Sequence, residues 1–396
     1  MTTRKIDFAK VMLCAFDADS RSKRECEVVK NLGFDVTIYD NSDKPSKYNN
    51  DYRFISKVVK FQGGLFSRAV EFVRWARTIR SGDHNVISAY DISALLICWL
   101  SNIGKPRHKK SLLVYDSHEF EFGRNTERPK WVSYLVVKFE RFLIRRCYQS
   151  IMVNETIALE VKKLHDLPVT PIVCRNIAPL TTVDDNVCRK RRDEMLTSAR
   201  KSSQTRVIMY HGGVVPGRGI EKIIDCLPYF EDVLFVVLGD GKSDYLSDLK
   251  SKVNFMGQSG NVLFIPAVPI GILWQYVGAA DVGMVNIENA SLSYYYSLPN
   301  KLFENVQAET PVVGSNFPEI AKIVEGYRIG LVCKSDSTKE IVFTVNNILS
   351  DKVLYSTLKE NLKEAKHVLC WENEKNILVN FYQEMQSNLK KNHDRN

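Results

Sequence analysis

Residues 207–221 read VIMYHGGVVPGRGIE, and this stretch indicates the architecture of the chain most clearly. Its first four residues are large, apolar and partly β-branched, as in a buried strand. The glycine-rich loop that follows allows the sharp turns that bring the backbone close to a ligand. The last residues begin a helical pattern. A strand, a glycine-rich turn and a helix in this order predict part of a Rossmann-like unit.

Further strand-like runs recur along the chain and alternate with longer helical ones. Strands separated by helices predict parallel, doubly wound sheets. We therefore expect an α/β protein with two Rossmann-like domains that face a central cleft, and functional residues directly after the strands. The first series of predicted strands is Val11–Phe16, Val36–Tyr39, Val86–Ala89, Leu112–Tyr115, Ile151–Val153 and Ile172–Cys174. The second series is Val207–Tyr210, Val233–Leu238, Val262–Ile265, Val282–Val285, Pro311–Gly314 and Gly330–Cys333.

The length of 396 residues exceeds what one hydrophobic core usually covers. We predict an N-terminal domain at 1–180 and a C-terminal domain at 207–372. The stretch 181–206 is polar and charge-rich, and is predicted to connect them. A helix at 373–396 is expected to pack back on the N-terminal domain.

Nine cysteines are scattered singly, without a CxxC pair. This spacing argues for reduced thiols in a cytoplasmic protein, and against a disulfide framework or a zinc site. The N-terminus lacks a signal-type apolar core. The most apolar later stretch, Ile92–Leu100, is far shorter than the roughly 20 residues that a membrane span requires.

Positive charge is concentrated in the first half of the chain. Residues 1–180 hold 30 Lys and Arg against 20 Asp and Glu, a net charge of +10. Two segments, Tyr52–Arg80 and Arg124–Gln149, combine basic with large apolar residues. Either they contact an anionic membrane surface, at the inner face of the membrane, or they are solvated basic faces over an ordinary core stripe. No nucleic-acid-binding motif is present, so no nucleic-acid partner is expected.

Residues 297–304 read SLPNKLFE and have the pattern of a phosphate-binding helix start. Ser297 is predicted as the N-cap, with Leu298 and Pro299 in the first turn, where proline's missing N–H costs nothing. The free amides of such a turn can hold a diphosphate, and Glu304 can accept hydrogen bonds from ribose hydroxyls. The alternative is an ordinary capped helix with a solvated glutamate.

Two glycine loops can complete such a site. Gly212 and Gly213 let the backbone approach a phosphate, and Arg218 supplies a permanent positive charge. Gly239 and Asp240, at the end of another strand, leave room for a flat base or a ribose. Plain turns explain both loops nearly as well.

Polar residues also follow strands in the N-terminal half. His118, in the run 116–119 after a strand, can donate a hydrogen bond or a proton near neutral pH, or be incidental to a helix cap. Residues 17–19 read DAD; for this pair acceptor contact or loop capping is favoured over metal binding. No obligatory metal is expected. The predicted acceptor-binding residues are Asp17, Arg21, Asp91 and Glu119.

Taken together, these motifs resemble the retaining glycosyltransferases of family 4, which have the GT-B fold. The resemblance is carried by YDSHE at 115–119, the loop at 212–219, and SLPNKLFE at 297–304 followed by TPVVGS at 310–315. It implies transfer of a hexose, with retention, from a UDP- or GDP-sugar to a saccharide or lipid-linked saccharide, as in bacterial surface-polysaccharide assembly. The nucleotide sugar is a substrate, so no cofactor is implied.

The resemblance also implies residue roles. His118 would reach the donor sugar and Arg218 the diphosphate. The base edge would be read at Ala267 and Val268, and Glu304 would bind the ribose. The remaining predicted donor-binding residues are Gly212, Gly213, Gly239, Asp240, Tyr296, Ser297, Leu298, Pro299, Asn300 and Lys301.

Two positions depart from the family pattern. Tyr296 stands where a glutamate often contacts the sugar, and Gly213 where a second arginine often contacts the diphosphate. Lys301 or Lys222 is expected to act with Arg218. Two other functions remain open: a sugar-nucleotide epimerase of the same fold, and a non-catalytic protein that binds a nucleotide sugar or an anionic surface.

Overall fold

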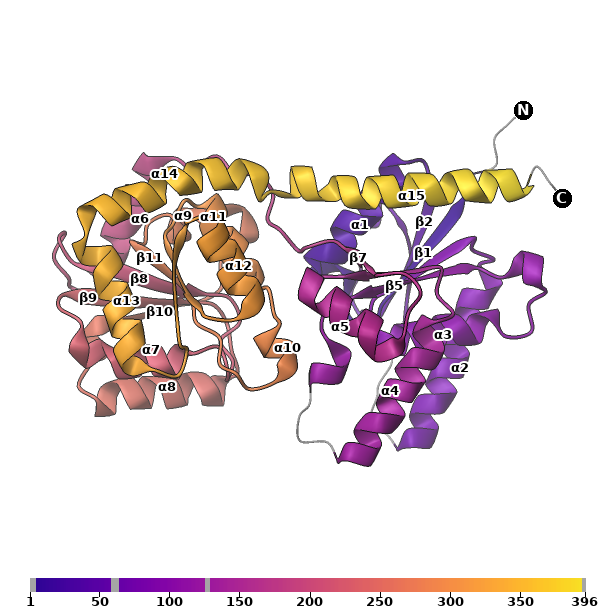
Figure 1. Ribbon diagram of the computed structural model, residues 1–396, viewed down its shortest axis with the longest axis horizontal. Helices are drawn as coiled ribbons and strands as arrows, with labels where there is room; N and C mark the ends of the chain where they lie inside the picture. Colours follow the sequence, from indigo (N-terminus) through magenta and orange to yellow (C-terminus); the bar gives the residue numbers. More distant parts are fainter. Residues whose placement is uncertain (1–4, 58–63, 125–128, 394–396) are drawn as a thin grey trace. The chain divides into compact units, whose positions relative to one another are not determined.

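The computed structural model describes residues 5–57, 64–124 and 129–393, which divide into two compact units (Figure 1). Unit 1 is Met1–Arg175 with Glu374–Asn396, and unit 2 is Asn176–Asn373. The chain therefore passes between the units twice. The stretch 181–206, predicted as a connection, lies within unit 2 and contains helix α6 (Asp185–Ser198).

Unit 1 is built on a parallel seven-stranded sheet in the order β3-β2-β1-β4-β5-β6-β7. Right-handed crossovers that lead away from β1 in opposite directions place helices on opposite faces of a sheet. Figure 1 accordingly shows α1 on one side of the sheet and α2, α3 and α4 on the other. The strands are β1 (Asp7–Val11), β2 (Asp35–Asp40), β3 (Arg53–Ser56), β4 (Val86–Ala89), β5 (Leu112–Ser117), β6 (Gln149–Met152) and β7 (Ile172–Val173). The helices are α1 (Ser20–Asn31), α2 (Leu65–Ser81), α3 (Ile92–Asn102), α4 (Lys130–Ile144), α5 (Glu155–His165) and α15 (Trp371–His393).

For this sheet, one predicted strand was wrong and one strand was not predicted. The first strand is Asp7–Val11, not Val11–Phe16. Lys10 interrupts the apolar pattern of this strand, and buried carboxylates neutralise the charge of the lysine. The edge strand β3 was missed, since its sequence RFIS is short and half polar. Short edge strands carry a weak sequence signal.

Unit 2 repeats the arrangement with a parallel six-stranded sheet in the order β10-β9-β8-β11-β12-β13. The strands are β8 (Arg206–His211), β9 (Val233–Leu238), β10 (Val262–Ile265), β11 (Val282–Val285), β12 (Val312–Ser315) and β13 (Gly330–Cys333). Besides α6, the helices are α7 (Ile220–Cys226), α8 (Ser243–Phe255), α9 (Ile270–Val277), α10 (Leu292–Tyr295), α11 (Asn300–Gln307), α12 (Pro318–Gly326), α13 (Thr338–Ser350) and α14 (Lys352–Val368).

Both faces of the unit 2 sheet are buried. Ile208 and Tyr210 of β8 pack in one cluster with residues of α7, α8 and α13. Val207 and Met209 point the other way, into a cluster with residues of α6 and α9. Alternate residues of a strand face opposite sides, so each face of β8 has its own core. The predicted α/β class, with doubly wound parallel sheets, is confirmed.

Helix α15 begins in unit 2 and belongs to unit 1 from Glu374 onward. Glu374 accepts a bidentate hydrogen bond from Arg175, with an Nη2–Oε2 distance of 2.6 Å. Further along α15, the buried hydroxyl of Tyr382 donates a hydrogen bond to Glu25 of α1. The ring of Tyr382 contacts the rings of Phe8 and Phe34 edge-on. The last helix therefore completes the core of unit 1.

All nine cysteines carry free thiols, and seven of them are buried. Among the helices of residues 5–57, 64–124 and 129–393, none combines the length and the apolar character that crossing a membrane requires.

Candidate functional site

In unit 2, the glycine loop at 212–219 joins β8 to α7 in a conformation that requires glycine. Gly212, Gly217 and Gly219 have φ values of 112°, 80° and 71°. Gly239, after β9, has a φ of 151°, and a Cβ there would lie 1.9 Å from the carbonyl oxygen of Gly212. The two predicted glycine loops are thus packed backbone against backbone, and this contact leaves no room for a side chain at Gly239.

Glu304 lies one turn into α11 and points to the end of β8. Its Oε2 atom is 2.9 Å from Nε2 of His211, the last residue of that strand. His211 is 1% exposed, whereas the Glu304 side chain is 21% exposed. The buried ring of His211 thus fixes one oxygen of the Glu304 carboxylate. Its second oxygen has no hydrogen-bond partner within the described part of the chain, so it is available to a ligand hydroxyl.

Lys301, also on α11, is buried and forms no salt bridge within the described part of the chain. Its Nζ atom lies 3.5 Å from the centre of the Tyr210 ring, and it has no hydrogen-bond partner among residues 5–57, 64–124 and 129–393. Burial, and then the charge of Arg218, hold the pKa of this ammonium group well below its usual range, against the opposing charge of Glu304. Since an unpaired buried donor is costly, an oxyanion at this position would find a preformed partner.

Arg218 lies near this lysine, and its guanidinium carbon is 4.9 Å from the centre of the Tyr294 ring. The side chain of Lys301 also approaches Gly212, where a Cβ would lie 3.9 Å from the lysine Cε. The structure therefore brings together Gly212 and Arg218 of the glycine loop with Lys301 and Glu304 of α11, two segments far apart in the sequence.

The start of the helix differs from the prediction. Helix α11 begins at Asn300, with Pro299 as the N-cap and no side-chain cap. Ser297 instead donates its hydroxyl hydrogen bond to the carbonyl of Tyr294, 2.7 Å away, in the turn that follows α10. The N-cap assignment of Ser297 was wrong because a second, four-residue helix precedes it. Leu298 is buried in the core.

The other predicted donor residues lie at strand ends or in the same turn. Asp240 accepts a hydrogen bond from the amide of Ala267, over 3.0 Å, so these two residues are joined directly. Val268 follows and is half-buried. Tyr296 is the C-cap residue that follows α10, and its ring centre lies 5.4 Å from that of Tyr295. Gly213 has open space where a side chain would stand.

In unit 1, His118 follows β5 and is fixed by neighbours on both sides. Its Nε2 atom lies 3.2 Å from Asp116, and its Nδ1 atom lies 3.7 Å from Asp19. The ring of Tyr90 packs against the imidazole, with 4.1 Å between ring centres. The side chain is 17% exposed, so a ligand can reach one edge of the ring.

The four predicted acceptor-binding residues already have partners in the protein. Asp17 accepts hydrogen bonds from the hydroxyl of Ser46 and the amide of Lys47. Asp91 caps α3, and Arg21 is buried with its guanidinium on Asp116. Glu119 is exposed. Loop capping is therefore the observed role of Asp17.

The Asp17 and Asp19 carboxylates both face protein donors, since Asp19 caps α1 through the amide of Ser22. Within the described residues, no three His, Cys, Asp or Glu side chains are grouped as metal ligands.

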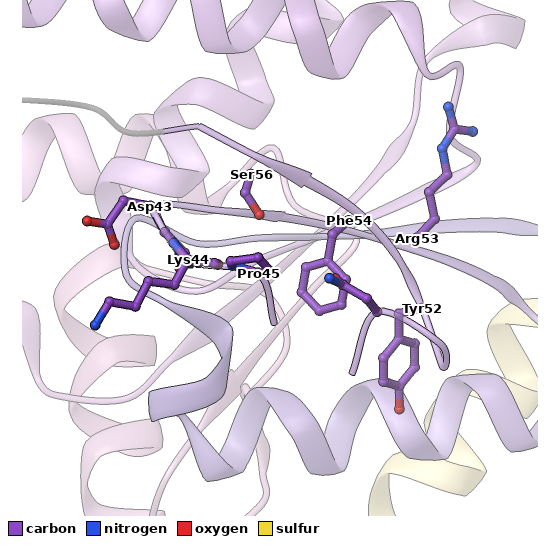
Figure 2. Close-up of a pocket in the computed structure, with 9 residues that line it drawn as sticks. Asp43, Lys44, Pro45, Tyr52, Arg53, Phe54 and Ser56 are labelled. Atoms are coloured by element: carbon purple, nitrogen blue, oxygen red, sulfur yellow. Dashed lines mark hydrogen bonds between the residues drawn. The ribbon is translucent and has the colours of Figure 1, made fainter. Parts of the chain in front are cut away.

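A concavity of about 690 Å³ lies in unit 1 beside the edge strand β3. Figure 2 shows the rings of Tyr52 and Phe54 at one end and the charged side chains of Asp43 and Lys44 at the other. The rest of its lining comes from the loop that follows β2 and from the strand itself. None of the predicted site residues lines it.

His211, the neighbour of Glu304, was missed, whereas Asp116, the neighbour of His118, belongs to the polar run 116–119 named above. Both residues lie at or near the end of a largely apolar strand. Asp116 and His118 are two residues apart, so the sequence itself keeps them close. His211 and Glu304 are 93 residues apart, so their contact depends on the fold.

The part of the chain that matches a known protein family lies in unit 2. Residues 191–365 match the family described as "Glycosyl transferases group 1". The chain is 25% identical over 183 residues to a chitobiosyldiphosphodolichol beta-mannosyltransferase of Candida albicans. That alignment covers 42% of the chain and 38% of the relative. The match thus spans less than half of that relative's length.

Solved structures agree over nearly the whole chain. A sucrose-phosphate synthase of Thermosynechococcus elongatus superposes with a TM-score of 0.79 at 14% identity, covering 97% of this chain and 100% of that one. The Anabaena protein HepE, in complex with UDP and glucose, gives 0.75 at 15% identity, covering 96% and 100%. These likenesses confirm the predicted fold. Residues 191–365 therefore match the glycosyltransferase group 1 family, within a chain of the GT-B fold.

Proposed function

We propose that the whole chain is a retaining glycosyltransferase that moves a hexose from a UDP- or GDP-sugar to a saccharide or lipid-linked saccharide. The observation that carries this proposal is the group around α11 in unit 2. Within the described residues, a buried lysine without a hydrogen-bond partner, an arginine, a glycine loop and a glutamate with one open oxygen suit a nucleoside diphosphate. HepE, which has the same fold, was solved in complex with UDP and glucose.

Within this proposal each group has a separate task. Glu304 accepts hydrogen bonds from the ribose hydroxyls through its open oxygen. Arg218 and Lys301 hold the diphosphate, and Lys301 replaces the cation that the family pattern has at Gly213. As the bond between the sugar and the diphosphate breaks, negative charge grows on the leaving group. Fixed positive charges at that point stabilise an oxocarbenium-like transition state.

Tyr296 and unit 1 are the parts of this proposal that concern the sugar and the acceptor. Tyr296 can donate to a sugar hydroxyl but has no charge at neutral pH. The name of the Candida relative specifies a lipid-linked saccharide acceptor, which is the acceptor class we propose here. Unit 1 would bind it at Glu119 and along the concavity beside β3. Replacing the exposed Lys44 by alanine should raise the KM for the acceptor without changing donor affinity; an unchanged acceptor KM would remove the concavity from the proposal.

Incubation with UDP- and GDP-sugars, each alone, tests the donor site. A ligand at a hundred times its Kd stabilises a protein by about 2.7 kcal/mol, so thermal unfolding should shift upward with one nucleotide class, accompanied by slow nucleotide release. No shift with any donor would contradict the proposal. Activity should persist in a chelator; complete loss that magnesium restores would show that a metal is required.

We further propose that unit 1 contacts an anionic membrane surface through α2 and α4. Residues 58–63 and 125–128 of the two basic segments lie outside the described residues. Helix α4 carries an exposed apolar stripe at the spacing of one helix face, and α2 adds an aromatic side chain that is 84% exposed. Basic side chains border the stripe. The stripe consists of Trp131, Tyr134, Leu135, Phe139 and Phe142, and the added residue is Phe66.

A lipid-binding experiment tests this surface directly. Each basic residue near an anionic surface contributes about 1 kcal/mol, and salt screens this attraction. The protein should therefore sediment with phosphatidylglycerol vesicles at low salt, and Trp131→Ser with Leu135→Ser should weaken that binding. Phe343→Ser is a matched control, since Phe343 is 70% exposed on α13 of unit 2. Failure of the wild-type protein to bind would sink the proposal.

A further inference from the structure

A cluster of buried charges lies beneath His118 in unit 1. Lys10 of β1 is fully buried and donates to Glu25, Asp116 and Ser88, over 2.5, 3.0 and 3.2 Å. Arg21 of α1 approaches the other oxygen of Asp116, with Nε 2.8 Å away. Two cations therefore face two carboxylates, and their charges balance without any contribution from the histidine.

The cluster joins segments from both ends of the chain. Glu25 also accepts hydrogen bonds from Ser88 and from the hydroxyl of Tyr382 on α15. Every member is at most 5% exposed. Buried charge clusters of this kind are rigid when all members are paired.

Asp116 remains ionised in this setting. Burial acts to raise the pKa of its carboxyl, but the charges of Arg21 and Lys10 outweigh burial and hold that pKa well below the usual range. An ionised carboxylate can only accept hydrogen bonds. Because Oδ2 of Asp116 lies 3.2 Å from Nε2 of His118, that ring nitrogen must carry the hydrogen.

We infer that Asp116 is a positioning residue that fixes neutral His118 as the Nε2–H tautomer and leaves Nδ1 as the nitrogen that meets the ligand. The distance from Nδ1 to the Asp19 carboxylate, 3.7 Å, is too long for a hydrogen bond. The packed ring of Tyr90 keeps the imidazole in this orientation.

The chemical consequence concerns the direction of the hydrogen bond. A neutral imidazole with its hydrogen on one nitrogen accepts at the other. His118 would therefore accept a hydrogen bond from a sugar hydroxyl at Nδ1, and not donate one. This role in transfer rests on the proposed function, whereas the tautomer does not.

The test is a nitrogen-15 NMR spectrum of the histidine-labelled full chain, recorded at a pH where the ring is neutral and assigned with H118Q. We expect a protonated Nε2 and an unprotonated Nδ1 in the wild-type protein. A protonated Nδ1, or fast exchange between the two tautomers, would overturn the inference. This measurement needs no variant that disturbs the buried cluster.

Two isosteric variants separate the carboxylates. In D116N, the amide oxygen should stay on the two Arg21 nitrogens that lie 2.8 and 2.7 Å from Oδ1 of Asp116. The amide nitrogen then faces His118 and Lys10, and Lys10 keeps Glu25 and Ser88 as acceptors. The ring hydrogen of His118 should therefore move to Nδ1. In D19N, the tautomer should stay as in the wild type, and the cap of α1 should be kept because an asparagine oxygen also accepts from the Ser22 amide. If D116N folds and keeps the Nε2–H tautomer, Asp116 does not position the ring.

Turnover measurements test whether the tautomer of His118 matters for sugar transfer. With the donor found above, D116N and H118Q should lower turnover, and the double variant should be no slower than H118Q alone. Additive losses would mean that Asp116 acts by another route. If the wild-type protein shows no transfer while the spectrum has the expected tautomer, the proposed function fails and the assignment of Asp116 stands.

Discussion

Replacing Glu304 by alanine should weaken nucleotide binding and stability by amounts that the structure sets. One carboxylate oxygen is held by His211 and the other is open. A hydrogen bond to a charged group contributes about 1.5–3 kcal/mol, so loss of one ribose contact should raise the Kd for UDP or GDP roughly tenfold to a hundredfold.

The same change removes the partner of a buried ring. His211 is 1% exposed, and a buried polar group that loses its partner costs about 1–3 kcal/mol. Urea denaturation should therefore show a lower free energy of unfolding for E304A. In E304Q the amide oxygen can still face His211, so stability should be nearly kept while nucleotide affinity falls.

Calorimetric titration of the wild type and both variants with UDP and with GDP measures the Kd for each nucleotide. The matched control is E360Q on α14, where the carboxylate is 72% exposed and pairs with Lys363. Exposed pairs contribute little to stability, so neither the nucleotide affinity nor the free energy of unfolding should change. Wild-type affinity in a folded E304A protein would refute the ribose role of Glu304. A surface-binding protein without a donor site would give that result.

Three further predictions concern stability, each measured by urea denaturation. Burial lowers the pKa of His84 from its usual 6.5 to about 4. Below pH 6.5 the unfolded chain binds a proton at this histidine that the folded chain does not, so the free energy of unfolding should fall by roughly 3 kcal/mol between pH 6.5 and pH 4. An equally steep fall with pH in wild type and H84Q would disprove this. Gly239→Ala should cost more than about 3 kcal/mol, because its positive φ and the nearby carbonyl both exclude a Cβ. Gly260→Ala, with no atom within 4 Å of its Cβ, is the control, and similar losses in the two would contradict the argument. Tyr382→Phe removes one hydrogen bond to the buried Glu25 carboxylate and should cost about 1.5 kcal/mol; an unchanged midpoint would show that α15 adds no such bond in solution.

Local patterns predicted most of the fold. Strand runs such as Val233–Leu238 and Val282–Val285 match the observed strands residue for residue, since a strand buried on both faces is apolar throughout and needs no partner to be recognised. The pattern failed where polar residues enter a strand. Lys10 inside β1 shifted the predicted strand by several residues, and the half-polar edge strand β3 was not recognised.

The sequence by itself determined the α/β class, the two series of strands and the glycine loops, because hydrophobic period and backbone freedom are properties of neighbouring residues. Only the tertiary structure decided which polar groups meet. His211 and Glu304 are 93 residues apart, and Tyr382 and Glu25 are 357 residues apart. Such pairs form because strand order and helix packing bring their segments together, and because a polar group that is buried without a partner lowers stability.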